Sequence, residues 1–306
     1  MARRTSVEFA SGGDDERCRA WLYEPEGAGP FPVIVMAHGL GGIKEMRLDA
    51  FAQHFCAGGY ACLVFDYRHF GASDGFPRQL LDINRQLEDW SSAIAFARSS
   101  SKLRSDQVVL WGTSFGGGHV ILSAARDRAI VAAIAQCPFT DGVASLLALN
   151  WRSAVKVTML ALWDVVRSVV GMAPAMLATA GPPGSAALMT APDALDGYLA
   201  LVPVGTAFRN QVAARFGLNI VWHRPGCKAG DIACPILFCV CETDSVAPAG
   251  PTKRYAKRAP KGEVRLYQAG HFAIYVGKGF EQVVADQLEF LQRHVPTKGR
   301  EAHVDL

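Results

Sequence analysis

A serine flanked by glycines, in the sequence GTSFG at residues 112–116, is the residue of this chain best suited to chemistry. An apolar run at 108–111 precedes it and predicts a short buried strand, while residues 119–125 predict a helix directly after it. A serine that attacks a carbonyl carbon must leave the sheet on a sharp, crowded turn, which calls for glycine two positions before and two positions after it. The start of the helix would also favour negative charge developing at this point. These features together predict that Ser114 is a nucleophile.

His271 is the histidine best placed to remove the proton of that serine, which a serine needs before it can attack. It lies in QAGHF at 268–272, directly after the last predicted strand, and so at the same edge of the sheet as Ser114. The rival histidines lie in predicted helices, in the long middle segment or in the C-terminal tail: His54, His119, His223, His294 and His303. A lone histidine in such a place is usually structural or solvent-exposed.

The base needs an acid that holds its tautomer, and Asp244 is the first choice. It follows the predicted strand at 235–241 in the sequence ETDSVAP, so the loop carries it to the same sheet edge. Glu242 is nearer the strand end and is expected to point into packing. Asp141, after the predicted strand at 130–137, is the serious alternative.

Acyl transfer also needs amide donors aimed at the oxyanion, each contributing about 3–4 kcal/mol. The amide of Phe115, directly after the serine, is one candidate. The second is the amide of Leu40 in HGLGG at 38–42, where glycines let the backbone approach closely. The alternative is that HGLGG is only a flexible turn between a strand and a helix.

Short apolar strands and amphipathic helices alternate along most of the chain, which predicts an α/β fold with a mostly parallel, doubly wound sheet. Helices are expected at 48–57, after residue 83, at 119–125, at 252–258 and near the C-terminus. The predicted strands are 6–10, 18–23, 33–37, 61–67, 108–111, 130–137, 235–241 and 264–268, the first two joined by a turn at 12–15. The tail after Pro296 is polar and expected to be loose.

The alternation stops at Pro138, and no buried strand is evident from about 140 to 232. We therefore expect a core of residues 1–139 and 233–306 and a helical cap of residues 140–232, inserted after the sixth strand. The apolar run near 153–180 is interrupted by Lys156, Asp164 and Arg167, so it should not span a membrane.

Composition excludes several classes of protein. Of the 306 residues, 50% are hydrophobic and 19% are charged, and the net charge is only +3, without a basic stripe for nucleic acid. The eight cysteines form no C-x-x-C pair and are expected to be buried thiols of a reduced, cytoplasmic protein. The opening MARRTSVEF has no apolar run typical of a secretory signal. No metal or cofactor is called for.

The motifs HGLGG, DYRHFGASDG at 66–75, GTSFGG, ETD and GH resemble the α/β-hydrolase superfamily, over nearly all of 5–295 except the cap. HGLGGIKEM and FDYRHFGASDG resemble the dienelactone-hydrolase-like and prolyl-peptidase-like esterases, whose neighbourhood includes fungal polyketide acyltransferases. The order Ser–Asp–His also matches this fold. The resemblance implies Ser114, Asp244 and His271 as triad and Leu40 and Phe115 as oxyanion donors. True dienelactone hydrolases use a cysteine nucleophile, so lactone specificity is not implied.

The leading hypothesis is a serine carboxylic-ester hydrolase that acts through an acyl-enzyme on a small to medium, apolar ester. An acyltransferase would use the same acyl-enzyme with an alcohol or amine as acceptor, and sequence does not separate the two. A peptidase is less favoured because no acidic cluster is evident to hold a peptide N-terminus. A non-catalytic scaffold conflicts with an intact triad. The expected partner is a small-molecule ester, and a homodimer is possible.

Overall fold

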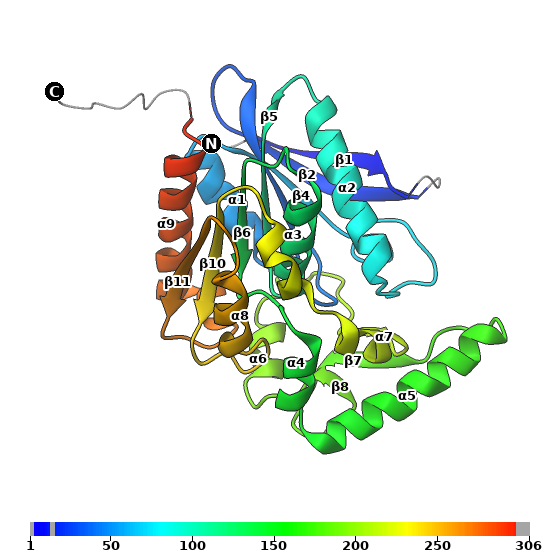
Figure 1. Cartoon of the computed structure of the whole chain (residues 1–306). Coiled ribbons are helices and arrows are strands. Elements are labelled where there is room, and N and C mark those ends of the chain that lie inside the picture. Colours follow the sequence, from blue (N-terminus) through cyan, green and yellow to red (C-terminus); the bar gives the residue numbers. More distant parts are fainter. Residues whose placement is uncertain (1–2, 13–15, 298–306) are drawn as a thin grey trace.

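A computed structural model describes residues 3–12 and 16–297 (Figure 1), so most of the predicted hairpin turn, His303 and nearly all of the tail lie outside the described residues. The eight-stranded sheet has the order β1-β2-β4-β3-β5-β6-β10-β11. Strands β1 and β2 are antiparallel to their neighbours, and the other six strands of this sheet run parallel to one another: β4, β3, β5, β6, β10 and β11. The strands are β1 (Arg3–Ala10), β2 (Arg17–Glu24), β3 (Phe31–Ala37), β4 (Ala61–Phe65), β5 (Leu103–Thr113), β6 (Ala132–Gln136), β10 (Ile236–Cys241) and β11 (Gly262–Tyr267).

Helices cover both faces of this sheet (Figure 1). Helices α1 (Leu48–Ala57) and α9 (Gly277–His294) pack against each other on one face. The opposite face carries α2 (Ile83–Ser99), α3 (Phe115–Arg126) and α8 (Ala249–Ala256). The central strands are buried on both sides, which is why they read as continuous apolar runs in the sequence.

The strand register brings the candidate residues to one edge of the sheet. Ala37 at the end of β3 pairs with Gly112 of β5, and Thr113 pairs with Gln136 at the end of β6. Cys241 at the end of β10 pairs with Tyr267 at the end of β11. Because parallel strands end at the same edge, the loops that follow all five strands meet there.

The segment between β6 and β10 is not wholly helical, which corrects the sequence-based prediction. It contains a separate three-stranded sheet of order β8-β7-β9. The strands are short and rich in alanine, so they carry little β-propensity of their own, and their mutual pairing stabilises them. The elements are α4 (Gly142–Ala148), α5 (Trp151–Val169), β7 (Met176–Ala180), β8 (Ala187–Met189), α6 (Ala194–Leu199), β9 (Gln211–Ala213), α7 (Phe216–Asn219) and two 3-10 turns, Ile220–Trp222 and Pro225–Asp231. A further 3-10 turn, Ala273–Tyr275, precedes α9.

Helix α5 is long, but neither it nor any other helix in the described part of the chain is apolar enough over enough length to cross a membrane. Within α5, the carboxylate of Asp164 is fully buried and lies 2.7 Å from Nε of Arg215. The same pair, with a hydrogen bond from the amide of Ala175, ties α5 to the segment that follows it.

A buried ion pair joins the loop after β4 to α2. Arg68 Nε lies 2.6 Å from Asp89 Oδ1, and both side chains are almost completely buried. Asp89 also accepts hydrogen bonds from the backbone amide of Arg68 and from the hydroxyl of Ser11 at the end of β1. This carboxylate therefore holds three separate segments together.

Replacing that carboxylate should be strongly destabilising. Asp89→Ala leaves the buried Arg68 guanidinium with only the partly exposed Glu16 and Glu88 as ion-pair partners. It also removes the acceptor of the Ser11 hydroxyl, and we expect a loss of about 3 kcal/mol in the free energy of unfolding. Urea denaturation followed by circular dichroism measures this. As a control, Asp231→Ala removes an ion pair with Lys228 in which both side chains are more than half exposed, and it should leave the midpoint unchanged. Equal midpoints for the two variants would contradict the assigned role of Asp89.

Candidate active site

Ser114 sits on a strained turn between β5 and α3. Its backbone has φ 54° and ψ −118°, a conformation that non-glycine residues rarely adopt. A Cβ atom at position 112 would lie 2.3 Å from the carbonyl oxygen of Gly116, and one at position 116 would lie 2.5 Å from that of His38. Only glycine fits at either position, so steric crowding explains why the motif has glycine at both 112 and 116.

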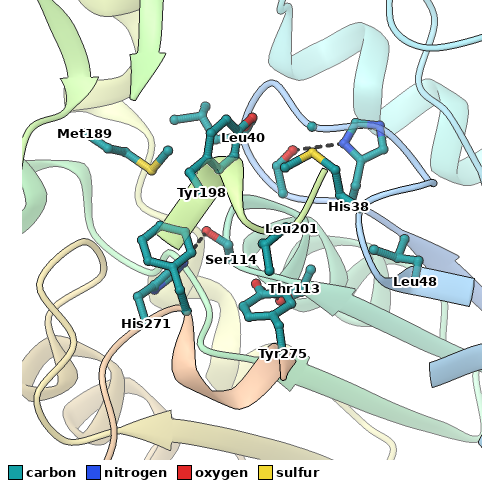
Figure 2. Close-up of a pocket in the computed structure, with 14 residues that line it drawn as sticks. His38, Leu40, Leu48, Thr113, Ser114, Met189, Tyr198, Leu201, His271 and Tyr275 are labelled. Atoms are coloured by element: carbon teal, nitrogen blue, oxygen red, sulfur yellow. Dashed lines mark hydrogen bonds between the residues drawn. The ribbon is translucent and has the colours of Figure 1, made fainter. Parts of the chain in front are cut away.

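Ser114, His271 and Asp244 form one continuous hydrogen-bonded array. Ser114 Oγ lies 3.0 Å from His271 Nε2 (Figure 2). His271 Nδ1 lies 2.7 Å from Asp244 Oδ2. The other carboxylate oxygen of Asp244 accepts hydrogen bonds from the amides of Val246 and Ala247. With the carboxylate fixed in this way, the imidazole donates from Nδ1 and presents Nε2 as an acceptor for the serine proton.

The surroundings of His271 raise its pKa. Burial disfavours the imidazolium and is the largest single influence on the pKa of His271. The Asp244 carboxylate, through its charge and its hydrogen bond to Nδ1, outweighs burial together with the adjacent Cys137. The pKa of His271 therefore lies well above its ordinary value of 6.5. The neutral base is fully present only above that raised pKa and is lost as the pH falls through it.

The alternative acids lie away from this array. Asp141 caps the N-terminus of α4, where its side chain accepts hydrogen bonds from the amides of Val143 and Ala144. Its other oxygen accepts a hydrogen bond from the Tyr255 hydroxyl at 2.7 Å. Burial tends to raise the pKa of Asp141, but this hydrogen bond and the helix amides outweigh it and lower the pKa. Glu242 does not point into packing as expected; it is partly exposed and interacts with Gln268 and with Lys253.

Of the rival histidines in the described chain, none approaches the serine hydroxyl within hydrogen-bond distance. His119 is buried beside Gln86, at 2.8 Å, and His223 stacks on Phe139. Burial lowers the pKa of His223 to about 4 and also lowers that of His119. His54 contacts the carbonyl of Ala50 within its own helix. His294, at the C-terminal end of α9, pairs with the carboxylate of Glu263.

The loop with the candidate oxyanion donor Leu40 packs directly on the serine turn. A Cβ atom at Gly39 would lie 3.0 Å from Ser114 Cβ, which is tighter than side chains normally pack, so glycine favours this close approach. The carbonyl of Leu40 accepts a hydrogen bond from the Tyr198 hydroxyl at 2.8 Å, which holds the loop in place. The amide of Leu40, in the preceding peptide, donates to no other group among the described residues. Phe115 is the first residue of α3, and its amide therefore has no partner within the helix.

A buried ion pair anchors the other end of this loop. Lys44 Nζ lies 2.5 Å from Asp66 Oδ2, and the backbone amide of Lys44 donates to Asp66 Oδ1 at 2.7 Å. Asp66 follows β4 directly and is fully buried. The backbone between residues 38 and 44 is thus fixed at both ends, which is what a preorganised amide donor requires.

The sequence did not reveal a second group of polar side chains behind the histidine. Cys137 Sγ lies 4.0 Å from His271 Nε2 and 3.5 Å from the Tyr275 hydroxyl. Thr113 also contacts that hydroxyl. The one available signal is that Cys137 and Thr113 stand at the ends of adjacent parallel strands.

The cysteines were predicted to be buried, and all are buried except Cys227, which is exposed. All eight cysteines are free thiols.

Two cavities open on either side of Ser114 and share it with Leu40 and Met189. The first contains about 380 Å³ of empty space and includes His271, Tyr198, Leu201 and Phe272 in its wall (Figure 2). The second contains about 530 Å³. Its wall includes Phe115, Phe139, Ala148, Leu149, Leu188 and Val246. Neither wall, as far as the described residues form it, contains an acidic side chain.

Comparison with known proteins gives the family. Residues 28–274 match the family described as serine aminopeptidase, S33. The chain belongs to this family. Over 292 residues it is 56% identical to the quorum-quenching protein AidA of Acinetobacter baumannii, and the match covers 95% of each chain. It is 27% identical to the polyketide transferase grgF of a Penicillium species, over 95% of this chain and 97% of that one.

Solved structures give the same fold. The α/β hydrolase GrgF from Penicillium superposes with a TM-score of 0.80 at 26% identity, over 95% of this chain and 99% of that one. DcsB, solved in complex with its substrate analogue, superposes with a TM-score of 0.80 at 26% identity, over 96% of this chain and 99% of that one. The predictions of an α/β-hydrolase fold and of an enzyme are confirmed. This member of the S33 family is an esterase-type hydrolase, and its named relatives are consistent with chemistry through an acyl-enzyme.

The raised pKa of His271 gives a pH-dependent prediction. We expect kcat/KM for an ester to fall below an apparent pKa that lies above 6.5, because protonation removes the base. Asp244→Asn removes the main stabilising charge, so the ionisation should move to lower pH, while kcat falls about 10²–10⁴-fold. Rate profiles and imidazole NMR titration measure the shift.

Asp141→Asn is the matched control, and its pH profile should coincide with that of the wild type. If Asp141→Asn instead moves the ionisation and Asp244→Asn does not, the acid must be reassigned to Asp141.

Proposed function

We propose that this S33-family protein is a serine ester hydrolase with Ser114 as nucleophile, His271 as general base and Asp244 as orienting acid. The continuous array from Ser114 Oγ through the imidazole to Asp244 carries this proposal. In the first step Ser114 Oγ forms a bond to the ester carbonyl carbon, and His271 Nε2 takes the hydroxyl proton. The carbonyl oxygen becomes an oxyanion.

Collapse of the tetrahedral intermediate breaks the bond to the leaving alcohol. His271 gives its proton to that alcohol, and the acyl group stays on Ser114. Water then attacks the acyl carbon, His271 removes the water proton, and the carboxylic acid leaves while Ser114 regains its hydrogen. We assign the amides of Leu40 and Phe115 as the oxyanion donors in both steps, because neither donates to another group among the described residues and both lie beside the serine.

The two cavities suit the two halves of an ester. The leaving alcohol must be close to His271, since the histidine protonates it, so we assign the cavity of about 380 Å³ to the alcohol. The cavity of about 530 Å³ has no histidine in its described wall and adjoins Phe115, so we assign it to the acyl group. Its wall is mostly apolar, with hydroxyl side chains from Ser145, Thr190 and Ser245, and this favours an apolar acyl chain.

Residues 140–232 are proposed to act as a lid over these cavities. Leu149 at the end of α4 and Met189 of β8 contribute to the acyl cavity, while Tyr198 and Leu201, in and after α6, contribute to the alcohol cavity. The triad residues all lie outside this segment. The lid therefore sets the size of the substrate and excludes water, and takes no part in proton transfer.

The relatives suggest two more specific activities for the same acyl-enzyme. The 56% identity to a quorum-quenching protein favours a signal molecule with an ester or lactone bond as substrate. The likeness to polyketide transferases favours delivery of the acyl group to an acceptor alcohol in place of water. The family description as aminopeptidase receives less support here, because a peptide amine would need an acidic partner beside the serine. The free thiols favour a reducing, cytoplasmic location.

Ser114→Ala should abolish turnover. We expect kcat for p-nitrophenyl butyrate to fall at least about 10⁴-fold, while the melting temperature changes little because the side chain is small and faces the cavities. A fluorophosphonate probe should label Ser114 of the wild type and nothing in the variant. Retention of more than a tenth of the activity would reject Ser114 as nucleophile.

The same assay, run with acyl-homoserine lactones and with added alcohols, separates the activities. Opening of the lactone supports the signal substrate, and an ester product formed from an added alcohol supports acyl transfer. Free acid from simple esters alone leaves hydrolysis as the activity.

The assignment of the cavities predicts opposite effects of two bulky substitutions. Leu149→Trp should narrow the acyl cavity and lower kcat/KM for an octanoate ester at least about tenfold, with an acetate ester changed less than about threefold. Leu201→Trp should instead discriminate against esters of bulky alcohols at a constant acyl chain.

Leu147→Trp is the control on α4, since Leu147 is 81% exposed and should alter neither preference. If Leu149→Trp changes the alcohol preference and Leu201→Trp the acyl preference, the two cavities are assigned the wrong way round.

A further inference from the structure

Large apolar side chains are concentrated on the surface of α5 and its immediate neighbours. Helix α5 crosses the edge of the molecule far from the main sheet (Figure 1). Its outer face exposes a group of valine, leucine, methionine and tryptophan side chains, each 50% to 81% exposed: Trp151, Val155, Met159, Leu162, Trp163, Val166, Val169 and, just after the helix, Val170. An exposed apolar surface of this extent marks an interaction site.

The spacing of these residues is that of a helix-pairing seam. Val155, Met159, Leu162, Val166 and Val169 follow one another at intervals of four, three, four and three, which is a heptad pattern. The opposite side of the helix faces the body of the protein through Ser153, Val157, Ala161 and Asp164. The heptad residues therefore point outward together, along the full length of the helix.

The basic side chains of α5 are turned back onto the chain itself. Lys156 Nζ donates to the carbonyl of Gly184 at 2.7 Å, and Arg167 Nε donates to that of Ala173 at 2.8 Å. Arg152 lies over the ring of Trp151 at the start of the helix. Arg152 and Lys156 are exposed beside the apolar face, and Arg167 also lies over the ring of Trp163. Each of the three cations nevertheless has a contact within its own chain, whereas a helix that binds anionic lipid leaves its cations free to reach the headgroups. The seam is thus suited to an apolar protein surface.

We propose that α5 pairs with α5 of a second copy of this chain, antiparallel, about a two-fold axis near Leu160 and Ala161. Any two-fold interface must be self-complementary, and this seam satisfies that condition. With the axis at its centre, Met159 faces Leu162 of the partner subunit, and Val155 faces Val166 of the partner subunit. At the same register Trp151 faces Val170 of the partner subunit and Val169 faces Arg152 of the partner subunit. Apolar side chains thus meet in the centre of the pair, and the arginine stem covers Val169 at each end.

The surface available is sufficient for a stable dimer. From their fractional exposures, the eight residues present roughly 900 Å² of surface, comparable with the roughly 800 Å² per partner of a standard interface. Trp151 and Trp163 are 70% and 53% exposed, and tryptophan is the residue type most enriched among the strong contacts of interfaces.

Light scattering after size exclusion tests the dimer directly. The wild type should have twice the 32.9 kDa of one chain at about 20 µM, a concentration above the μM-to-pM range of Kd that standard-size interfaces show. Met159→Lys combined with Leu162→Lys should give the mass of one chain, with an unchanged melting temperature and unchanged turnover of an acetate ester. Val204→Lys, at a fully exposed apolar residue outside the seam, should leave the dimer intact.

A wild-type monomer at this concentration overturns the proposal, and so does a dimer that persists in the double variant. Sedimentation of the wild type with vesicles of phosphatidylglycerol would assign the seam to a membrane instead. Since none of these measurements depends on Ser114, a failure here leaves the proposed function untouched.

Disulfide trapping tests the orientation. In a Cys227→Ser background, which removes the exposed native thiol, Val155→Cys together with Val166→Cys should form a covalent dimer on mild oxidation. Val155→Cys alone should remain monomeric on a denaturing gel, because the two positions lie at opposite ends of an antiparallel pair. Efficient cross-linking of the single variant would show a parallel pair and overturn the antiparallel arrangement.

Discussion

The backbone of Ser114 imposes the constraint on which the rest of the structure depends. A serine at φ 54° and ψ −118° costs about 1–3 kcal/mol, so neighbouring contacts must hold it there. The amide of Ser114 donates to Gln136 of β6, and its carbonyl accepts from Phe139, both at 2.9 Å. The turn is thus fastened to the strand beside it. The glycines on either side let α3 and the 38–42 loop press against it without steric conflict.

A buried polar network beneath the turn extends that constraint across the sheet. Gln287 of α9 accepts a hydrogen bond from the Trp111 indole and donates to the side chain of Gln136. Gln136 in turn donates to the Thr113 hydroxyl, one residue before the nucleophile. These groups are buried and satisfied by one another, and satisfied networks of this kind favour one packing arrangement over its alternatives. The last helix therefore helps to fix the strand end that carries the serine.

Local patterns predicted the main sheet and its loops well, because every core strand is a compact apolar run followed by a turn. The chain order Ser–Asp–His and the position of each residue after a strand were sufficient to select three residues that the fold brings within hydrogen-bond distance. Strands β7 to β9 were missed, because three to five alanine-rich residues become strands only through partners distant in sequence. The contacts of Cys137 and Tyr275 beside His271 were missed for the same reason, because tertiary packing alone decides which residues surround them.

Helix α5 shows why the role of the middle segment could not be derived from periodicity. Its buried face holds a serine, an aspartate and only small or medium apolar residues, while its large apolar residues face outward. The apolar face therefore predicts the wrong side as core. If the proposed dimer forms, α5 is held on both sides, by Asp164 and Arg215 within the chain and by the seam outside it.

Helix α4 ends where α5 begins, with Asn150 capping the new helix, and it supplies Leu149 to the proposed acyl cavity. Any opening of the lid would then have to occur around α6, on the side of the alcohol cavity, since α4 is tied to the fixed helix.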